Sequence, residues 1–213
     1  MNDLTRHAVL IEPDGALREL VLAWKSRAAA RWPSSAYVAH PPHSTVWAGE
    51  VADAVGAEEA VRAVAAALPE FCTTRHVPHV FYNDAFAAGG HTCAFAAGLT
   101  DDLARLQFAV CDAIRPHAIR KADSQLPVAL RRDPFLRSWR QYGFPFVGSH
   151  WIPHLTIASV PTRPDDPFVA EFLASAAGPP QAVRAVSWWR ITGERHERLA
   201  SMRLAPRTPE VAR

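Results

Sequence analysis

The sequence predicts a mixed fold of helices and strands, built from two similar halves. Segments with one apolar helical face alternate along the chain with short β-rich segments. Both halves follow the order strand, helix, strand, helix, strand. The composition is that of a globular protein, since 49% of the 213 residues are hydrophobic and 21% are charged. The length fits one domain of two lobes over residues 1–213.

The first half begins with an apolar run at residues 7–12, which predicts a buried strand that Pro13-Asp14-Gly15 ends. The helix that follows begins near residue 15, because its apolar residues share one face: Leu17, Leu20, Val21 and Trp24. The remaining elements expected in this half are a strand at 43–48, a helix at about 52–68, a β-rich segment at 72–83, a turn at Gly89-Gly90 and a strand at 91–98.

The second half begins with a helix at Thr100-Asp101-Asp102, where the threonine caps the first turn and the acids favour it. A long irregular region is expected at about 115–150. The later elements are a strand at 154–160, a helix started by Asp165-Asp166-Pro167, and strands at 183–191 and 199–204. Helix start and middle strand are 28 residues apart in the first half and 53 in the second, so about 25 residues are inserted within 115–150.

The two middle strands carry the same short motif, Pro-His-x-Thr-aliphatic. It reads Pro42-His43-Ser44-Thr45-Val46 in the first half and Pro153-His154-Leu155-Thr156-Ile157 in the second. Residues i and i+2 of a strand point to one face, so each histidine shares a face with its threonine. One copy alone is typical of a half-buried strand histidine with a satisfied hydrogen bond. Two copies on equivalent strands favour a functional pair.

Such a pair suits displacement at a phosphodiester. One neutral imidazole accepts a proton from the attacking hydroxyl or water, and the opposed imidazolium donates a proton to the leaving oxygen. The hydroxyls of Thr45 and Thr156 can donate hydrogen bonds to the non-bridging phosphate oxygens. Because side chains supply every proton transfer and oxygen contact, this chemistry needs no metal and no cofactor.

With these motifs the chain resembles the 2H phosphoesterase superfamily, which is marked by two His-x-Thr/Ser motifs, over about residues 5–205. The resemblance implies an α+β fold of two pseudo-symmetric lobes, each a small, mostly antiparallel sheet with helices outside and an active-site groove between. It implies metal-independent hydrolysis of 2′,3′-cyclic phosphate RNA ends, or of a related cyclic nucleotide. His43 and His154 would be catalytic, and Thr45 and Thr156 would bind phosphate.

The insertion and several aromatic residues are candidates for substrate contacts. The insertion carries seven basic and two acidic residues, a balance of +5, and Arg131 and Arg132 would hold a polyanion if it forms a flap over the groove. Trp47 lies four residues after His43 and would share its face, where it could stack on a base. Tyr142 and Trp151 could also stack on a nucleobase. The alternatives are a solvated loop for the arginines and anchors to the core for the aromatic residues of the insertion.

Other classes of function are disfavoured. A net charge of +2 does not suit a protein that coats nucleic acid over its whole surface. A zinc site ranks low, since the paired histidines have no cysteine or carboxylate at ligand spacing. A nucleotide- or RNA-binding module without turnover and an RNA 2′-5′ ligase-type activity remain alternatives. Intact histidines and threonines in both motifs favour the enzyme.

The expected location is the cytoplasm. The three cysteines are scattered, which suggests reduced thiols. Residues 1–6 lack the basic and apolar pattern of a secretion signal, and no apolar run approaches the length of a membrane span. The expected partner is an RNA end or a small cyclic nucleotide, and the oligomeric state is not predicted.

Overall fold

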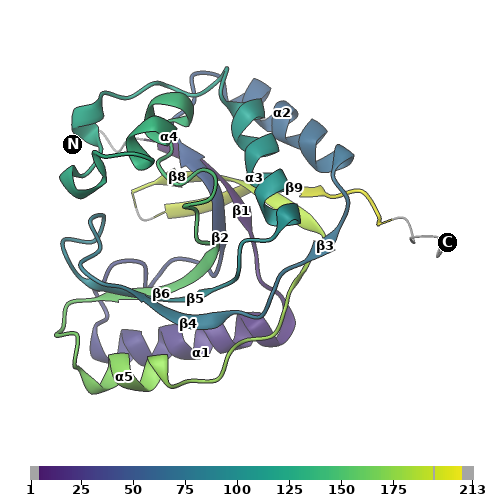
Figure 1. Ribbon diagram of the computed structural model, residues 1–213. Coiled ribbons are helices and arrows are strands. Elements are labelled where there is room, and N and C mark those ends of the chain that lie inside the picture. Colours follow the sequence, from purple (N-terminus) through teal and green to yellow (C-terminus); the bar gives the residue numbers. More distant parts are fainter. Residues whose placement is uncertain (1–4, 194, 208–213) are drawn as a thin grey trace.

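The computed structural model describes residues 5–193 and 195–207, and its centre is one seven-stranded antiparallel sheet (Figure 1). The strand order is β4-β5-β6-β2-β1-β8-β9. These strands are β1 (Thr5–Ile11), β2 (Ser44–Gly49), β4 (Val77–Phe81), β5 (His91–Ala96), β6 (His154–Val160), β8 (Ala185–Thr192) and β9 (Arg195–Arg203). A separate two-stranded sheet pairs β3 (Phe71–Cys72) with β7 (Ala182–Val183).

The helices cover the two halves of the sheet separately. They are α1 (Gly15–Arg31), α2 (Ala54–Ala67), α3 (Asp101–Ile114), α4 (Phe135–Tyr142) and α5 (Pro167–Leu173). In Figure 1, α1 and α5 lie below β4, β5 and β6, whereas α2, α3 and α4 lie with β1, β2, β8 and β9. Each group encloses its own hydrophobic core. The structure is therefore α+β with two lobes, as predicted.

The two lobe sheets meet at β2 and β6. The register there is a single pair, Ser44 opposite Leu155, whereas the other neighbours are paired over five or more residues. The two small sheets expected from the resemblance are thus halves of one continuous sheet. The strands that join them are the two that carry the His-x-Thr motifs.

Local sequence signals explain where three of the helices begin. The Thr100 hydroxyl accepts a hydrogen bond from the Leu103 amide at the start of α3, as predicted. The Asp166 carboxylate accepts one from the Phe168 amide at the start of α5, where Pro167 occupies the first turn. Asp53 caps α2 in the same way through the Gly56 amide.

The prediction of irregular structure throughout 115–150 is wrong for one segment. This region holds the helix α4 and two short 3-10 turns, η1 (Asp123–Gln125) and η2 (Val128–Leu130). The signals for α4 are present in the sequence: Trp139 and Tyr142 lie on one helical face with Phe135, and Gly143 ends the helix with a left-handed φ of 65°. The abundance of arginine hid this apolar face.

The β-rich segment expected at 72–83 contains the end of β3 and all of β4, which belong to different sheets. All three cysteines are free thiols, with Cys93 and Cys111 buried. None of the helices in the described ranges is long and apolar enough to cross a membrane. Residues 1–4, 194 and 208–213, which include most of the predicted signal-free start and both ends of the predicted domain, lie outside the described residues.

Candidate active site

The four motif side chains lie on one face of the sheet, where its two halves join. Ser44 pairs with Leu155, and both are buried. Side chains alternate along a strand, so the residues on either side of this pair point to the opposite face. Those residues are His43, directly before β2, Thr45 on β2, and His154 and Thr156 on β6, all partly exposed.

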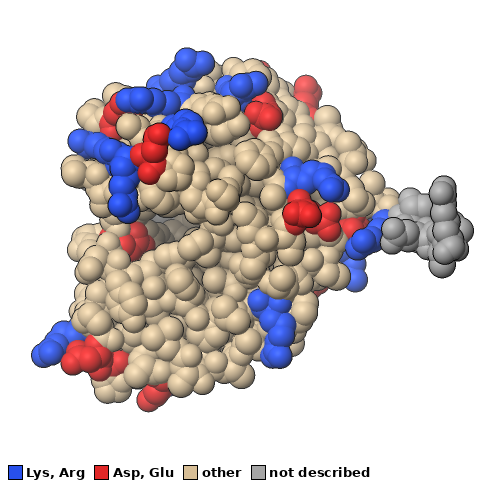
Figure 2. Space-filling model, in the orientation of Figure 1, with Lys and Arg blue, Asp and Glu red and all other residues tan. Residues whose placement is uncertain are grey.

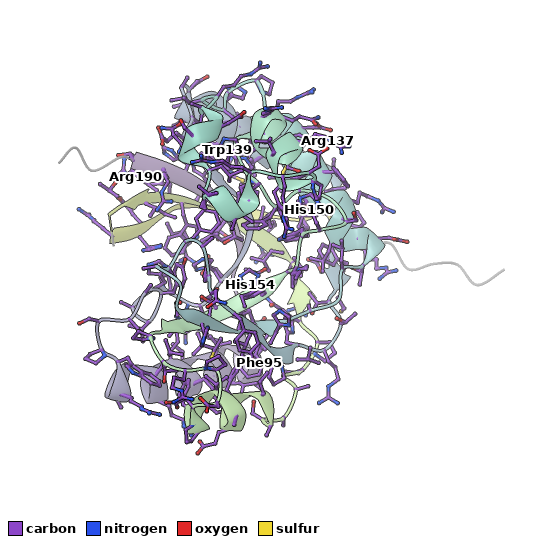
Figure 3. All side chains as sticks on the ribbon, turned by 60° about the vertical axis from the view of Figure 1, so that its left-hand side comes forward. Phe95, Arg137, Trp139, His150, His154 and Arg190 are labelled. Carbon is purple, nitrogen blue, oxygen red and sulfur yellow. The ribbon has the colours of Figure 1, made fainter. Side chains whose placement is uncertain are left out.

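This face borders a hollow between the lobes. Figure 2 shows the hollow at the left of the molecule, between its upper and lower parts. Figure 3, which brings that side forward, places His154 between the two lobes. A substrate in the hollow would therefore reach the motif side chains from solvent.

Both imidazoles are held by the same hydrogen bond. The Nδ1 atom of His43 lies 2.7 Å from the Pro41 carbonyl oxygen, and that of His154 lies 2.7 Å from the Ile152 carbonyl oxygen. Because a carbonyl only accepts, each Nδ1 carries the proton and donates it. In the neutral ring Nε2 is then the free acceptor. The two histidines thus present the same nitrogen in the same tautomer.

A β-bulge follows each threonine. The pairing of β1 with β2 steps from Val9–Trp47 to Leu10–Thr45, which leaves Val46 as the extra residue. The pairing of β5 with β6 steps from Cys93–Ala158 to Ala94–Thr156, which leaves Ile157 as the extra residue. Val46 and Ile157 occupy the same position in the two motifs. The two motifs are therefore alike both in sequence and in the position of the bulge.

The bulge overturns the prediction for Trp47. An extra residue reverses the alternation of side chains beyond it, so Trp47 does not share the face of His43. The indole is fully buried in the core of its lobe, and its Nε1 donates to the Tyr142 carbonyl over 3.0 Å. Trp47 cannot stack on a substrate base.

Tyr142 and Trp151 are also core residues rather than exposed stacking platforms. They are 8% and 4% exposed. The indole Nε1 of Trp151 donates to the Thr45 carbonyl over 3.1 Å. These two aromatic residues anchor the insertion to the motif strand β2, which is the alternative interpretation of the sequence. The proposal that they stack on a nucleobase is corrected accordingly.

The predicted arginine contacts lie on the lobe above the hollow. Basic side chains gather on this part of the surface (Figure 2). Arg131 stabilises the loop before it, because its guanidinium donates to the Leu126 and Ser124 carbonyls, each over 2.7 Å. Arg132 is exposed. Two other arginines are paired within the insertion, Arg137 with Asp133 and Arg140 with Asp123.

Burial lowers the pKa of both histidines, but their charged neighbours differ. Burial lowers the pKa of His43 to about 3, opposed by the hydrogen bond to Pro41 and assisted by His40, His196 and Lys25. Burial also lowers the pKa of His154, with a further lowering from His79, while the hydrogen bond to Ile152 and the Asp84 carboxylate raise it. Both rings are thus neutral acceptors near pH 7.

Two neighbours of the histidines could not be found from the sequence. The His196 ring, on β9, lies 6.3 Å from that of His43 and 4.2 Å from that of His40 between centroids. The Phe81 ring, on β4, lies 4.9 Å from that of His154. Both contacts cross intervening strands of the sheet, so no spacing in the sequence signals them. Within residues 5–193 and 195–207, no cluster of three or more histidine, cysteine or acidic residues could hold a metal ion.

Solved structures share this fold. LigT of E. coli in complex with 3′-AMP superposes with a TM-score of 0.52 at 15% identity, covering 94% of this chain and 98% of that one. TT0787 of Thermus thermophilus gives a TM-score of 0.59 at 11% identity, covering 95% and 100%. LigT without ligand gives 0.56 at 14% identity, covering 94% and 98%.

No protein-family model and no curated protein sequence matches the chain. The similarity to the solved structures spans both lobes and the strands that join them, so it concerns the whole described architecture. The chain therefore has the same fold as LigT and TT0787, the two-lobed α+β fold that the resemblance through its two His-x-Thr motifs implies.

Proposed function

We propose that this protein is a phosphodiesterase that opens 2′,3′-cyclic phosphates at RNA ends or in a related cyclic nucleotide. One observation carries the proposal: on adjacent strands, His43 and His154 share a face and present the same free Nε2, because each Nδ1 donates to the carbonyl two residues before it. Paired acid–base catalysis at one phosphate needs this arrangement. Complexes of E. coli LigT with 3′-AMP and with phosphate support the substrate class.

The charged neighbours suggest which histidine does what. His40, His196 and Lys25 all disfavour a proton on His43, which suits a general base. Asp84 favours a proton on His154, which suits a general acid. The negative charge of a bound phosphodiester favours the imidazolium further. In this scheme Nε2 of His43 accepts a proton from water while the oxygen of that water forms a bond to phosphorus. Nε2 of His154 donates a proton to the ribose oxygen as its bond to phosphorus breaks.

The threonines complete the scheme. Thr45 and Thr156 flank the same site, and each hydroxyl can donate one hydrogen bond to a non-bridging phosphate oxygen. Charge on those oxygens is then shared between two donors from opposite lobes. Loss of either hydroxyl removes one neutral hydrogen bond and should cost less than loss of a histidine.

The test is hydrolysis of 2′,3′-cyclic AMP in the presence of EDTA. We expect turnover to persist, and His43→Ala or His154→Ala to lower kcat about 10²–10⁴-fold. His76→Ala is the matched control, because this buried ring also donates from Nδ1 to a proline carbonyl, that of Pro179, outside both motifs. Full activity in either motif variant, or abolition of activity by EDTA, would refute the mechanism. Nucleotide binding without turnover in the wild type would support a binding module instead.

A substrate with a p-nitrophenyl leaving group separates the two roles. This leaving group departs without a proton, so the general acid becomes dispensable while the base does not. We expect His154→Ala to retain most of its activity on such a phosphodiester, and His43→Ala to be as impaired as on the cyclic nucleotide. The reverse pattern would exchange the two assignments.

A further inference from the structure

Each of the two bulges leaves the carbonyl oxygen of its extra residue, Val46 or Ile157, without a partner on the neighbouring strand of the bulged pair. The extra residue of a bulge is unpaired with the neighbouring strand, and a buried carbonyl without a partner is costly. Val46 and Ile157 are both completely buried. Each carbonyl oxygen accepts a hydrogen bond from a buried polar side chain on a helix of its lobe.

Lys25 on α1 meets the bulge of the second motif. It is 5% exposed, and its Nζ donates to the Ile157 carbonyl over 2.9 Å. The same Nζ lies 2.7 Å from the Tyr37 carbonyl and 3.5 Å from the Val38 carbonyl. Tyr37 and Val38 belong to the loop that leads into His43. One ammonium group thus joins the bulge of the second motif to the approach of the first.

Gln107 on α3 meets the bulge of the first motif. It is fully buried, and its Nε2 lies 3.4 Å from the Val46 carbonyl and 2.7 Å from the Phe146 carbonyl. Its Oε1 accepts from the Gly148 amide over 2.9 Å. Phe146 and Gly148 belong to the segment that leads into His154. The side chain therefore joins the bulge of the first motif to the approach of the second.

We infer that Lys25 and Gln107 are positioning residues, which together fix the two catalytic imidazoles relative to one another across the joint between the lobes. The two contacts are related crosswise: each side chain holds the bulge of one motif and the approach to the other. The inference rests on the proposed function for the catalytic role of the histidines. It assigns these two residues no contact with substrate, since both lie in the cores behind the sheet.

The hydrophobic effect does not explain why the Lys25 ammonium and the Gln107 amide are buried. A buried lysine is disfavoured unless its ammonium is satisfied, and a buried amide likewise. The joint they span has the fewest paired residues of the sheet, since only Ser44 and Leu155 pair between the lobes. Small errors in the position of catalytic groups are enough to cost about 10²-fold in rate. Lys25 and Gln107 each connect one motif to the approach of the other, and so limit movement of the two histidines relative to one another.

The test uses methionine, which fills a similar volume and donates no hydrogen bond. Lys25→Met and Gln107→Met should each lower kcat on 2′,3′-cyclic AMP by about 10-fold to 10²-fold with little change in KM. Gln181→Met is the matched control: it is also a buried glutamine, whose Nε2 donates to the Glu12 carbonyl over 2.6 Å, but it touches neither motif nor its approach. It should leave kcat unchanged. Lys25→Leu, which also donates no hydrogen bond, replaces Lys25→Met if the latter does not fold, with the same expected loss.

A second readout does not depend on turnover. Nitrogen NMR of the imidazoles should show proton-bearing Nδ1 in both motif histidines of the wild type and of Gln181→Met. In Lys25→Met and Gln107→Met this preference should weaken, because the carbonyls of Pro41 and Ile152 are no longer held in place. Unchanged kcat together with unchanged imidazole signals would overturn the inference, as would an equal loss of kcat in the control. A wild type with no phosphodiesterase activity would instead refute the proposed function, and the NMR comparison would still decide the positioning role.

Discussion

At the scale of single residues, the two motif histidines are alike in anchoring and unlike in electrostatic surroundings. In each, the Nδ1–H group donates to the carbonyl oxygen two residues earlier in the chain. The proline between them favours an extended backbone at the residue that carries this carbonyl. The sequence predicted the pair and the shared face. It could not predict that His196 and Lys25 lie near His43 while Asp84 lies near His154, because those neighbours come from other strands and helices.

The lowered pKa of His43 makes the free energy of unfolding sensitive to acid. Its pKa in the folded protein is about 3, below the 6.5 of the free side chain, because burial disfavours the imidazolium. Between these values the unfolded chain holds a proton that the folded protein does not. The stabilisation is therefore present above pH 6.5 and is lost as pH falls towards 3, by about 3 kcal/mol at pH 4.

Denaturant unfolding at several pH values measures this effect. The free energy of unfolding of the wild type should fall more steeply between pH 6.5 and pH 4 than that of His43→Gln, which does not titrate there. Parallel pH profiles for the two proteins would show that His43 takes up its proton equally in the folded and unfolded states.

At the scale of secondary structure elements, the bulges decide which side chains face the hollow. A regular strand would place Trp47 beside His43, which is why spacing alone misassigned it. The extra residue Val46 turns the indole into the core instead. The sequence carries no signal for a bulge at this position, since Val46 and Ile157 are ordinary strand residues. The motif periodicity therefore predicts the face on which the histidines and threonines lie, and it fails beyond the bulge.

Trp47→Phe tests this correction. The smaller ring leaves a void beside Trp188, whose ring lies 6.5 Å away, and abandons the Tyr142 carbonyl. We expect the free energy of unfolding to fall by about 1–3 kcal/mol. The KM for 2′,3′-cyclic AMP should stay unchanged at temperatures where the variant is folded. A large rise in KM without loss of stability would return Trp47 to the substrate site.

At the scale of the whole molecule, the order of elements predicted two lobes, and the structure has them. The segment predicted as an insertion lies between α3 and β6 and holds η1, η2 and α4. What the sequence could not give is how the lobes join, because a single residue pair links β2 to β6. The helix α4 was missed for a different reason: Phe135, Trp139 and Tyr142 share one helical face, but the arginines around them obscured that pattern. The insertion is anchored through Tyr142 and Trp151. Its arginines are exposed, whereas Lys121 is partly buried against Glu50.

The basic surface of the insertion should govern the length of substrate rather than the chemistry. Arg137 and Arg140 are paired with acids, whereas Arg120 and Arg132 have no ion-pair partner in the part of the chain that the structure describes. Replacing Arg120 and Arg132 by Gln should weaken cleavage of an RNA oligonucleotide with a cyclic phosphate end and reduce its dependence on salt. Hydrolysis of 2′,3′-cyclic AMP, which has no further phosphates, should barely change.

Arg62→Gln combined with Arg163→Gln is the control, because it removes the same charge from α2 and from the loop before α5. Equal losses on both substrates in the Arg120 and Arg132 variant would assign the segment to the active site itself or to folding. No loss on either substrate would make these arginines a solvated surface.

A crystal structure of the protein with inorganic phosphate tests most directly whether two histidines from opposite lobes act on one phosphate. We expect a phosphate in the hollow, with the Nε2 atoms of His43 and His154 each about 3 Å from one of its oxygens and the two threonine hydroxyls on others. A phosphate bound by one imidazole alone, or bound elsewhere while this site stays without it, would contradict the two-histidine mechanism.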